Sequence, residues 1–375
     1  MLYESRLTNS EIERYSRQII LSQIGVDGQI HLRNAKVLIV GLGGLGSPVL
    51  MYLASCGIQT IGIVDYDKLE LHNLQRQVIH NEEGLHTSKV ESAANFARKL
   101  NSTINIVEHD MFFSSDTVDD LVSKYDVIVD CSDNIDARYQ LSDFCKKYGK
   151  KMVLASVLKF EGQVFILPVD GPCYRCLFPE RKLSVQNCDE AGVLGPVCGI
   201  IGSIQATEVI KMIISNDATP KLLTYDAFKS EMKTFDLSKK KNQKCPVCVR
   251  KEIPMKVFLE GTKPPKMVKC DPERKISWKQ YLEKPDDFVL VDVRPKSLFN
   301  ICKIKDSINI SSEDFMKDYK IEVPGSDKKK ILLLCKKGVT AAKVGNFLLE
   351  NERTAYVLEG GLKSFKSDID HTFPL

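Results

Sequence analysis

The chain has 375 residues, and its 53 basic and 49 acidic side chains leave a formal net charge of only +4. This near balance of charge argues against direct binding of nucleic acid, and the length suits one large and one small domain. The N-terminal stretch MLYESRLTNS contains no hydrophobic run of the signal-peptide kind. The most apolar region, residues 37–58, contains five glycines and a proline, which favours strand, turn and buried helix over a membrane span. We therefore expect a soluble, cytosolic protein that makes no contact with a membrane.

Short β-branched runs alternate with helical patterns along the first two-thirds of the chain. Strands are expected at residues 35–41, 60–65, 105–110, 126–133 and 151–157. A clear helical pattern covers residues 89–101. Strands that alternate with helices predict a parallel sheet with helices on its faces, which is an α/β fold of the Rossmann type.

Residues 250–275 are rich in lysine and proline and show no clean period, so we interpret them as a linker. A second α/β pattern follows this segment. The elements expected there are helices near 277–284 and 340–351 and strands at 288–294, 330–335 and 354–361. We therefore predict a first domain over residues 1–249 and a second, small α/β domain over residues 276–375.

A glycine-rich loop follows the first expected strand, in the stretch VLIVGLGGLGSP. Gly41, Gly43, Gly44 and Gly46 permit a tight turn and let backbone N–H groups approach a phosphate at the start of the next helix. Asp65 ends the next strand, where a carboxylate can bind ribose hydroxyls. These features alone predict an adenine-nucleotide site, and an NAD-dependent oxidoreductase is one class of protein that fits them.

Polar residues beyond this loop favour a nucleoside triphosphate over a dinucleotide. Asn73 and Arg76 lie in LHNLQRQ, Lys89 lies in HTSKVES, and Asp133 and Asn134 lie in DCSDN. Two cations and a carboxylate at the end of a strand suit a triphosphate with its Mg²⁺. Taken singly, either cation could equally be a surface charge, and it is the combination that predicts binding of ATP.

These segments resemble the MoeB/ThiF group of E1-like enzymes, in which ATP adenylates the C-terminal glycine of a small ubiquitin-like protein. The stretches that carry the resemblance are RYSRQIIL, GLGGLG, DYDKLELHNLQRQ, DCSDN, FEGQV and CYRCLFPE, from about residue 11 to residue 248. By this resemblance, the residues implied to bind the nucleotide and its Mg²⁺ are Gly44, Asp65, His72, Asn73, Leu74, Gln75, Arg76, Lys89, Asp133 and Asn134. The resemblance also implies a homodimer, in which Arg17 reaches into the site of the other subunit.

Four of the twelve cysteines form two C-x₂-C pairs, CYRC and CPVC. In a chain without a secretion signal, such cysteines indicate metal binding or catalysis rather than disulfide bonds. Cys173 and Cys176, with Cys245 and Cys248, can supply four thiolates for a tetrahedral Zn²⁺ of structural kind. Thioredoxin-like redox chemistry uses the same spacing, but neither pair precedes a helix in the expected context.

Cys188 lies in a glycine-bearing loop before a long helical pattern, which is where the nucleophile of E1 enzymes is found when it is present. A flexible loop could bring this thiol to an acyl-adenylate, and a helix N-terminus nearby would favour its thiolate. The resemblance therefore implies a catalytic Cys188, with a passive loop cysteine as the alternative. Cys198, between GPV and GII, is expected to pack against the sheet.

The C-terminal domain resembles rhodanese in the stretches FVLVDVRPKSLFNICKIKDSINI and VLEGGLKSF. Cys335 ends the run KILLLC and opens the loop CKKGVTA, which precedes a helix. Inward-pointing amides, together with Lys336 and Lys337, would stabilise a thiolate or a persulfide there. Cys302 is the competing thiol, and it lacks an obvious nest of amides. An inert strand-end cysteine in a degenerate domain is the alternative.

The two resemblances together imply an activator of sulfur-carrier proteins, in which one domain makes an acyl-adenylate and the other presents sulfur to attack it. The expected partners are a ubiquitin-like carrier that ends in Gly-Gly and a cysteine desulfurase or other persulfide donor. The thiocarboxylate product would supply sulfur for tRNA wobble-uridine thiolation or for molybdopterin. The alternatives are an NAD-dependent oxidoreductase and a non-catalytic adaptor for a β-grasp protein.

Overall fold

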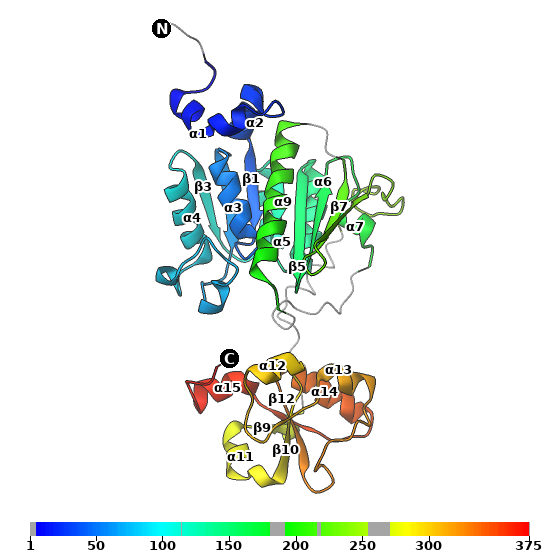
Figure 1. Ribbon diagram of the computed structural model, residues 1–375. Coiled ribbons are helices and arrows are strands. Elements are labelled where there is room, and N and C mark those ends of the chain that lie inside the picture. Colours follow the sequence, from blue (N-terminus) through cyan, green and yellow to red (C-terminus); the bar gives the residue numbers. More distant parts are fainter. Residues whose placement is uncertain (1–4, 114, 181–191, 216–218, 254–270, 375) are drawn as a thin grey trace. The chain divides into compact units, whose positions relative to one another are not determined.

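The computed structural model describes residues 5–113, 115–180, 192–215, 219–253 and 271–374. The chain forms two compact units, Met1–Thr262 and Lys263–Leu375, which are drawn in Figure 1. Each unit has its own sheet and its own hydrophobic core, so each is described by itself.

An eight-stranded sheet runs through the first unit in the order β3-β2-β1-β4-β5-β6-β7-β8. Its strands are β1 (Lys36–Val40), β2 (Thr60–Asp65), β3 (Asn105–Asp110), β4 (Val127–Asp130), β5 (Lys151–Leu158), β6 (Glu161–Leu167), β7 (Lys221–Asp226) and β8 (Glu231–Asp236). The strands from β3 to β5 are parallel, and β6 to β8 extend the sheet antiparallel. The expected parallel sheet is confirmed, although β4 ends earlier than the sequence suggested.

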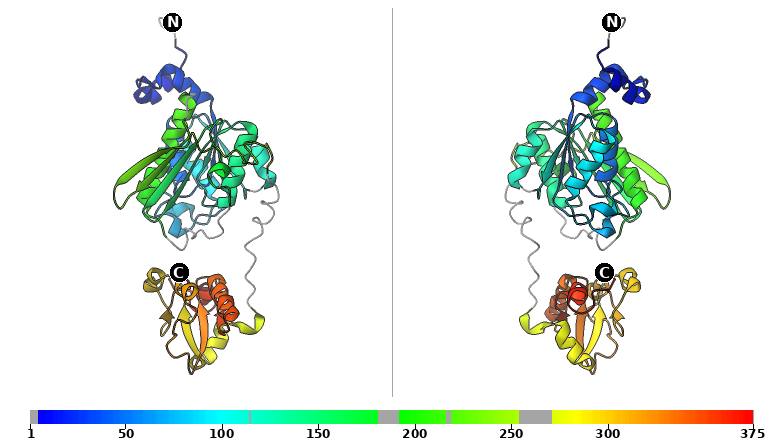
Figure 2. Two further views of the ribbon diagram at one scale, coloured as in Figure 1. Left: turned by 90° about the vertical axis from the view of Figure 1, so that its right-hand side faces the viewer. Right: turned by 90° about the vertical axis from the view of Figure 1, so that its left-hand side faces the viewer.

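Helices cover both faces of this sheet, which the two side views of Figure 2 make visible. The helices of the first unit are α1 (Asn9–Ile19), α2 (Gly25–Asn34), α3 (Gly46–Ser55), α4 (Lys89–Leu100), α5 (Ser115–Ser123), α6 (Ile135–Tyr148), α7 (Tyr174–Leu177) and α9 (Gly195–Ile214), with short 3₁₀ turns at Leu71–Asn73 and Glu82–Gly84. One buried cluster packs α2, α3, α4 and α9 on one face, and a second packs α5 and α6 on the other. Because both faces are covered, β1 is a continuous apolar run, buried from Val37 to Val40.

The sequence explains where two helices near the sheet edge begin. The Ser88 hydroxyl accepts a hydrogen bond from the Val90 N–H at the start of α4. The Asn134 carboxamide accepts from the N–H groups of Asp136 and Ala137 at the start of α6. Such caps satisfy N–H groups that have no partner within the helix, so they fix the first residue of each helix.

The strand order reverses direction between β1 and β4, and this is where ligands bind in open α/β sheets. The loops after these strands touch each other there, because a Cβ added to Gly41 would lie 2.9 Å from the backbone carbonyl of Cys131. Gly41 also has φ +92°, a conformation that L side chains rarely adopt. The fold therefore places the glycine-rich loop and the loop after β4 at one edge of the sheet.

The second unit is a five-stranded parallel sheet in the order β11-β10-β12-β13-β9. Its elements are β9 (Lys275–Ile276), α11 (Trp278–Glu283), β10 (Phe288–Asp292), α12 (Lys296–Ile301), β11 (Ile308–Asn309), α13 (Ser312–Lys317), β12 (Lys330–Leu334), α14 (Val339–Glu350), β13 (Tyr356–Leu358) and α15 (Gly361–Asp368), with 3₁₀ turns at Pro272–Arg274 and Pro285–Asp287. Buried clusters lie on both faces of this sheet, with Phe315 on one and Trp278 on the other. This is the small α/β domain expected from the sequence.

Candidate functional sites

The glycine-rich loop is held in a shape that only glycine permits at its ends. A Cβ on Gly46 would lie 2.0 Å from the carbonyl oxygen of Gly41, so the chain turns back on itself without room for a side chain. α3 begins at Gly46, directly after this turn, and the Ser47 N–H donates to the Gly43 carbonyl oxygen at 3.0 Å, so the helix N-terminus is joined to the loop. This arrangement of tight turn and helix N-terminus suits a phosphate group.

Asp65 lies at the C-terminal end of β2, where the sequence placed it. One carboxylate oxygen accepts a hydrogen bond of 2.8 Å from the Leu42 N–H, and the other accepts from the N–H groups of Tyr66 and Asp67 at 2.9 and 3.0 Å. Asp65 is half-buried. It therefore ties β2 to the glycine-rich loop as well as offering oxygens to a ribose.

The segment from His72 to Arg76 approaches the glycine-rich loop from one side. Asn73 is buried, and its side-chain oxygen accepts from the Glu70 N–H at 2.9 Å. The side chain of Arg76 runs past Gly44, since its Cγ lies 3.3 Å from where a Cβ on Gly44 would be. The Gln75 carbonyl packs against the N-terminus of α9, whereas the side chains of Gln75 and His72 are exposed and that of Leu74 is half-buried. The structure thus brings Asn73 and Arg76 to the loop.

Lys89 opens α4 and points back toward β2. Its Nζ forms an ion pair of 2.8 Å with Asp67, and its side chain is only 7% exposed while that of Asp67 is 47% exposed. The buried ammonium group of Lys89 is therefore paired with a carboxylate that is partly exposed to solvent. The sequence analysis did not single out Asp67, although the spacing in DYD, two residues after Asp65, could have drawn attention to it.

His80 is a second residue that the sequence analysis missed. Its Nε2 lies 3.2 Å from the Leu42 carbonyl oxygen and its Nδ1 lies 2.8 Å from the Ser92 hydroxyl. Burial is the main cause that lowers the pKa of His80 below its usual value, so the neutral ring donates one bond and accepts the other. Leu42 is thus held through both of its backbone polar groups, by Asp65 and by His80.

The loop after β4 carries the two remaining predicted nucleotide residues. Asp133 is exposed and Asn134 is half-buried, with its side-chain oxygen engaged in the cap of α6. Beneath them, Asp130 is fully buried and forms an ion pair of 3.0 Å with Arg138. This buried pair is structural: it fixes the loop from which the Asp133 carboxylate extends.

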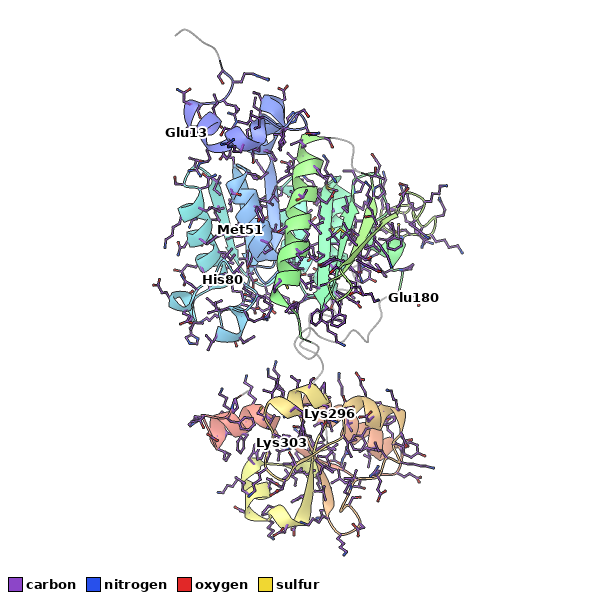
Figure 3. The ribbon with its side chains drawn as sticks, in the orientation of Figure 1. Glu13, Met51, His80, Glu180, Lys296 and Lys303 are labelled. Carbon is purple, nitrogen blue, oxygen red and sulfur yellow. The ribbon has the colours of Figure 1, made fainter. Side chains whose placement is uncertain are left out.

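One predicted residue, Arg17, is not brought to this edge within the unit. Arg17 is an exposed residue of α1. Figure 3 labels Glu13, also on α1, at the end of the first unit opposite to His80. Any contribution of Arg17 to a nucleotide site therefore needs a second copy of the chain. Cys188 lies outside the described residues.

Four cysteines form a candidate metal centre that is joined to α6 through Arg175 and Asp143. The Sγ atoms of Cys173, Cys176, Cys245 and Cys248 all lie within 4.8 Å of one another. Three of the Sγ–Sγ distances are 3.7, 3.5 and 3.7 Å. A tetrahedral ion bound at about 2.3 Å from each sulfur requires sulfurs about 3.8 Å apart, so the cluster fits Zn²⁺.

The cysteine cluster is anchored to α6 by a buried ion pair. Arg175, between the first two cysteines, donates to both carboxylate oxygens of Asp143 at 2.9 and 2.8 Å. Hydrogen bonding within the cluster lowers the pKa of Cys176 below its usual range and raises the pKa of Cys173 and of Cys248. The metal-free cluster thus shares protons among its sulfurs, and a bound metal ion would replace them.

Cys335 follows β12 in the second unit and lies at the start of α14. Its side chain is buried, with the residue 3% exposed, and its Sγ accepts a hydrogen bond of 3.3 Å from the Ala341 N–H. Gly338 caps the helix at φ +80°, and the Leu362 N–H donates to the Cys335 carbonyl at 3.0 Å. Lys336 and Lys337 are exposed at the rim of this loop. The sulfur of Cys335 therefore lies at a helix N-terminus, where a backbone N–H donates to it, with two cations on its loop.

Cys302, the competing thiol, is in a different setting. It is half-buried after α12, and its Sγ donates to the Pro374 carbonyl oxygen at 2.8 Å. Its own carbonyl oxygen accepts from Arg294, which is paired with the buried Asp292. Cys302 thus helps to hold the C-terminal segment in place, and the geometry favours Cys335 as the reactive thiol.

Comparison with known proteins identifies the class to which these two sites belong. Residues 15–247 match the ThiF family, and residues 277–368 match the rhodanese-like domain. The chain therefore belongs to the ThiF family of E1-like enzymes, has its ATP-binding adenylation fold, and carries a C-terminal rhodanese domain.

Relatives that match nearly the whole chain narrow this class further. The chain is 38% identical to the adenylyltransferase and sulfurtransferase MOCS3 of Culex quinquefasciatus, over 99% of this chain and 91% of that protein. It is 36% identical to the adenylyltransferase and sulfurtransferase MOCS3 of Dictyostelium discoideum, over 99% of this chain and 98% of that protein. A solved structure of E. coli MccB with ATP superposes on 64% of the chain and 75% of its own with a TM-score of 0.55, at 23% identity. The chain is thus an adenylyltransferase and sulfurtransferase, and the alternative of an NAD-dependent oxidoreductase is set aside.

Proposed function

We propose that this chain adenylates the C-terminal glycine of a ubiquitin-like sulfur carrier and then converts that carboxylate to a thiocarboxylate. The observation that carries the proposal is the buried Cys335 thiol at the N-terminus of α14, in a chain whose other unit has an adenylation fold. Adenylation activates a carboxylate toward nucleophiles, and a sulfur nucleophile on the same chain can attack the activated acyl group.

In the first step, a carboxylate oxygen of the carrier attacks the α-phosphorus of ATP, and the bond to the pyrophosphate leaving group breaks. No general base is needed, because the carboxylate is already ionised. The enzyme has to align the reactants and neutralise phosphate charge. Arg76, beside the glycine-rich loop, and Lys89, paired with Asp67, would supply this positive charge. Asp133 would hold Mg²⁺, which offsets phosphate charge when bound.

In the second step, Cys335 carries a persulfide received from a cysteine desulfurase or another persulfide donor. Its terminal sulfur attacks the acyl carbon of the adenylate, AMP leaves, and an acyl disulfide joins the carrier to Cys335. If Cys188 then attacks the Cys335 sulfur, the S–S bond breaks and the carrier departs as a thiocarboxylate. A Cys188–Cys335 disulfide remains and needs a thiol reductant. In the other order, Cys188 first forms a thioester with the carrier.

The four-cysteine cluster takes a structural part in this proposal. With four protein ligands, Zn²⁺ has no open position for substrate, so it would tie the loop before α7 to the segment after β8. The described cysteines form no disulfide, which suits a reducing compartment, and we place the chain in the cytosol.

The proposal is tested by incubating the enzyme with ATP, Mg²⁺, a persulfide donor and a candidate carrier ending in Gly-Gly. We expect ATP–pyrophosphate exchange that depends on the carrier, and a carrier whose intact mass rises by the difference between sulfur and oxygen. Cys335→Ala should keep the exchange and lose the mass change, whereas the matched variant Cys302→Ala should keep both. Absence of exchange would favour the non-catalytic adaptor, and thiocarboxylate made by Cys335→Ala would remove Cys335 from the mechanism.

We further propose that the active species is a homodimer. Large apolar side chains are exposed on α3 and α9 and directly after α1: Ile20 is 73% exposed, Leu21 50%, Tyr52 46% and Ile200 38%. α9 is apolar enough along its length to pass for a membrane span, yet one side of it packs on β5 and β6. A second copy of the chain would cover such a face and bring its own α1, with Arg17, toward a neighbouring site.

Complementation between variants tests the dimer and the role of Arg17 together. Arg17→Ala and Lys89→Ala should each lose the exchange reaction. When the two are mixed and allowed to exchange subunits, each heterodimer regains one intact site, so activity should return to about a quarter of wild type. Complete lack of recovery in a mixture proven to form heterodimers would mean that Arg17 acts within its own subunit or not at all.

Two pathways can use a thiocarboxylate on a carrier protein. A thiocarboxylate on a carrier can supply sulfur either for tRNA wobble-uridine thiolation or for molybdopterin. Offering the two kinds of carrier side by side in the mass assay distinguishes these outlets, because the preferred carrier is the one that gains sulfur at the lower concentration.

A further inference from the structure

Two segments of the first unit concentrate positive charge to a degree that the whole chain does not reveal. Residues 144–151 (FCKKYGKK) and 236–252 (DLSKKKNQKCPVCVRKE) are here called the basic lobe. Together they contain ten basic and two acidic residues, a net charge of +8, whereas the complete chain carries +4. The rest of the chain has 43 basic and 47 acidic residues and is therefore net acidic.

The two segments meet around a cavity next to the cysteine cluster. This cavity has a volume of about 500 Å³, and four lysines contribute to its lining along with Cys248. The four lysines come from both segments: Lys146, Lys147, Lys241 and Lys251. Like charges that converge on one hollow repel each other, so this arrangement favours an anion within it.

The lysines differ in how far they are already engaged. Lys146 donates to the carbonyl oxygens of Pro168, Val169 and Gly171 at 2.6–2.9 Å, and Lys147 pairs with Asp119 at 2.7 Å. These two have structural tasks. Lys241 and Lys251 are exposed, and neither forms an ion pair with any residue that the structure describes. They are the cations available to a ligand.

The cysteine cluster cannot account for this excess of charge. Four thiolates around one Zn²⁺ carry −2, and Asp119 adds one further negative charge beside Lys147. Among the ion pairs of the described residues, only that of Lys147 with Asp119 involves a lysine of the basic lobe, so most of the +8 is not paired there. The lysines are more than a neutralising shell for the metal.

We propose that the basic lobe binds RNA through its phosphate backbone. Lysine is depleted in the cores of protein–protein interfaces, where aromatic residues and arginine are enriched, so a cluster this rich in lysine does not suit a protein partner. Phosphates are compact anions that lysine contacts as a point charge, and basic residues on a small zinc-binding lobe are a recurring means of RNA binding. The lining of the cavity includes no residue of the glycine-rich loop, and the proposed binding requires neither adenylation nor sulfur transfer.

The experiment uses the full chain and a fluorescein-labelled, unmodified tRNA transcript, with binding followed by fluorescence anisotropy at several salt concentrations. Wild type should bind the transcript, and affinity should fall steeply with salt because cations on the RNA are released. The double variant Lys241→Glu/Lys251→Glu should bind at least about tenfold more weakly, with a salt dependence reduced by the two lost phosphate contacts. The matched variant Lys36→Glu/Lys99→Glu makes the same change of charge on exposed lysines outside the basic lobe and should bind nearly as wild type does.

Two further measurements keep the test specific. Zinc content and carrier-dependent ATP–pyrophosphate exchange should be unchanged in Lys241→Glu/Lys251→Glu, which shows that the lobe is folded and that adenylation is separate. The proposal is overturned if wild type does not bind the transcript at low salt, or if both double variants lose equal affinity. It is also overturned if the basic-lobe variant binds RNA normally but loses affinity for an acidic carrier protein, because the surface is then a protein interface.

Discussion

Gly44 offers the sharpest test of how the glycine-rich loop is packed. In Gly44→Ala the new Cβ would lie 2.9 Å from Cys198 Sγ, 3.2 Å from Cys198 Cβ and 3.3 Å from Arg76 Cγ. The arginine side chain can move, but Cys198 is in the first turn of α9 and 4% exposed, so it has little room. Overpacking of this kind costs about 1–3 kcal/mol, and we expect Gly44→Ala to lower the free energy of unfolding of the first unit by that amount.

The assay exploits the distribution of tryptophan in the chain. Trp278, the single tryptophan, belongs to the second unit, so its fluorescence follows that unit, while far-UV circular dichroism during urea unfolding also follows the first. The expected result is an earlier transition of the first unit and an unchanged Trp278 transition. Gly43→Ala is the matched control, because its nearest neighbour, Gln77 Nε2, is at an ordinary 3.7 Å.

A double variant completes this test. Cys198→Ala removes the closest atom, so Gly44→Ala/Cys198→Ala should recover at least about half of the stability lost by Gly44→Ala relative to the Cys198→Ala background. We also expect a higher KM for ATP in Gly44→Ala, since Arg76 is displaced. The reasoning fails if Gly44→Ala and Gly43→Ala unfold at the same urea concentration, or if the double variant recovers nothing.

Three further predictions concern the other sites. Cys245→Ser should lose the bound zinc measured by elemental analysis and destabilise the first unit by several kcal/mol, whereas Cys56→Ala should keep the metal. Protonation of His80 is disfavoured in the folded state, since burial lowers its pKa, so stability should fall as pH drops through about 6.5; His80→Gln should reduce that fall in urea unfolding between pH 7.5 and 5.5. Gly361→Ala puts a Cβ 2.1 Å from the Cys335 carbonyl oxygen at φ +59°, so it should weaken the second unit by at least about 2 kcal/mol in the Trp278 transition and abolish sulfur transfer while sparing exchange.

Each of these predictions has an outcome that would contradict it. Zinc retained in Cys245→Ser would mean that the cluster binds metal with three sulfurs or at another place. An unchanged pH dependence in His80→Gln would assign it to another group, such as His109, whose pKa is also lowered by burial. Normal sulfur transfer by Gly361→Ala would show that the loop around Cys335 tolerates movement of its carbonyl.

The strands and the candidate loops were predictable because they depend on local patterns. β1 is apolar throughout because both of its faces are covered, and such a run is visible in the sequence without knowledge of its neighbours. The glycine-rich loop, Asp65 and the two C-x₂-C pairs have spacings that follow from the chemistry of phosphate and metal binding. The sequence also placed Cys335 at the end of a strand and before a helix, as found.

Contacts between distant segments could not be predicted in the same way. The ion pair of Lys89 with Asp67 joins α4 to the end of β2, and the two bonds of His80 join three segments. A sequence pattern does not show which of its polar residues will meet across the sheet edge. The basic lobe was missed for a different reason: a chain-wide net charge averages its lysines with acidic residues elsewhere, although its two segments are separated by only about 85 residues.

The burial of Cys335 determines which atom of a persulfide meets other molecules. A second sulfur attached to Sγ lies about 2 Å beyond it. Cys335 is 3% exposed and Lys336 and Lys337 are exposed on its loop, so an outer sulfur that reaches a partner has to extend toward that rim. In the proposed mechanism the buried Sγ is then shielded from oxidants, and only the sulfur to be transferred meets the carrier.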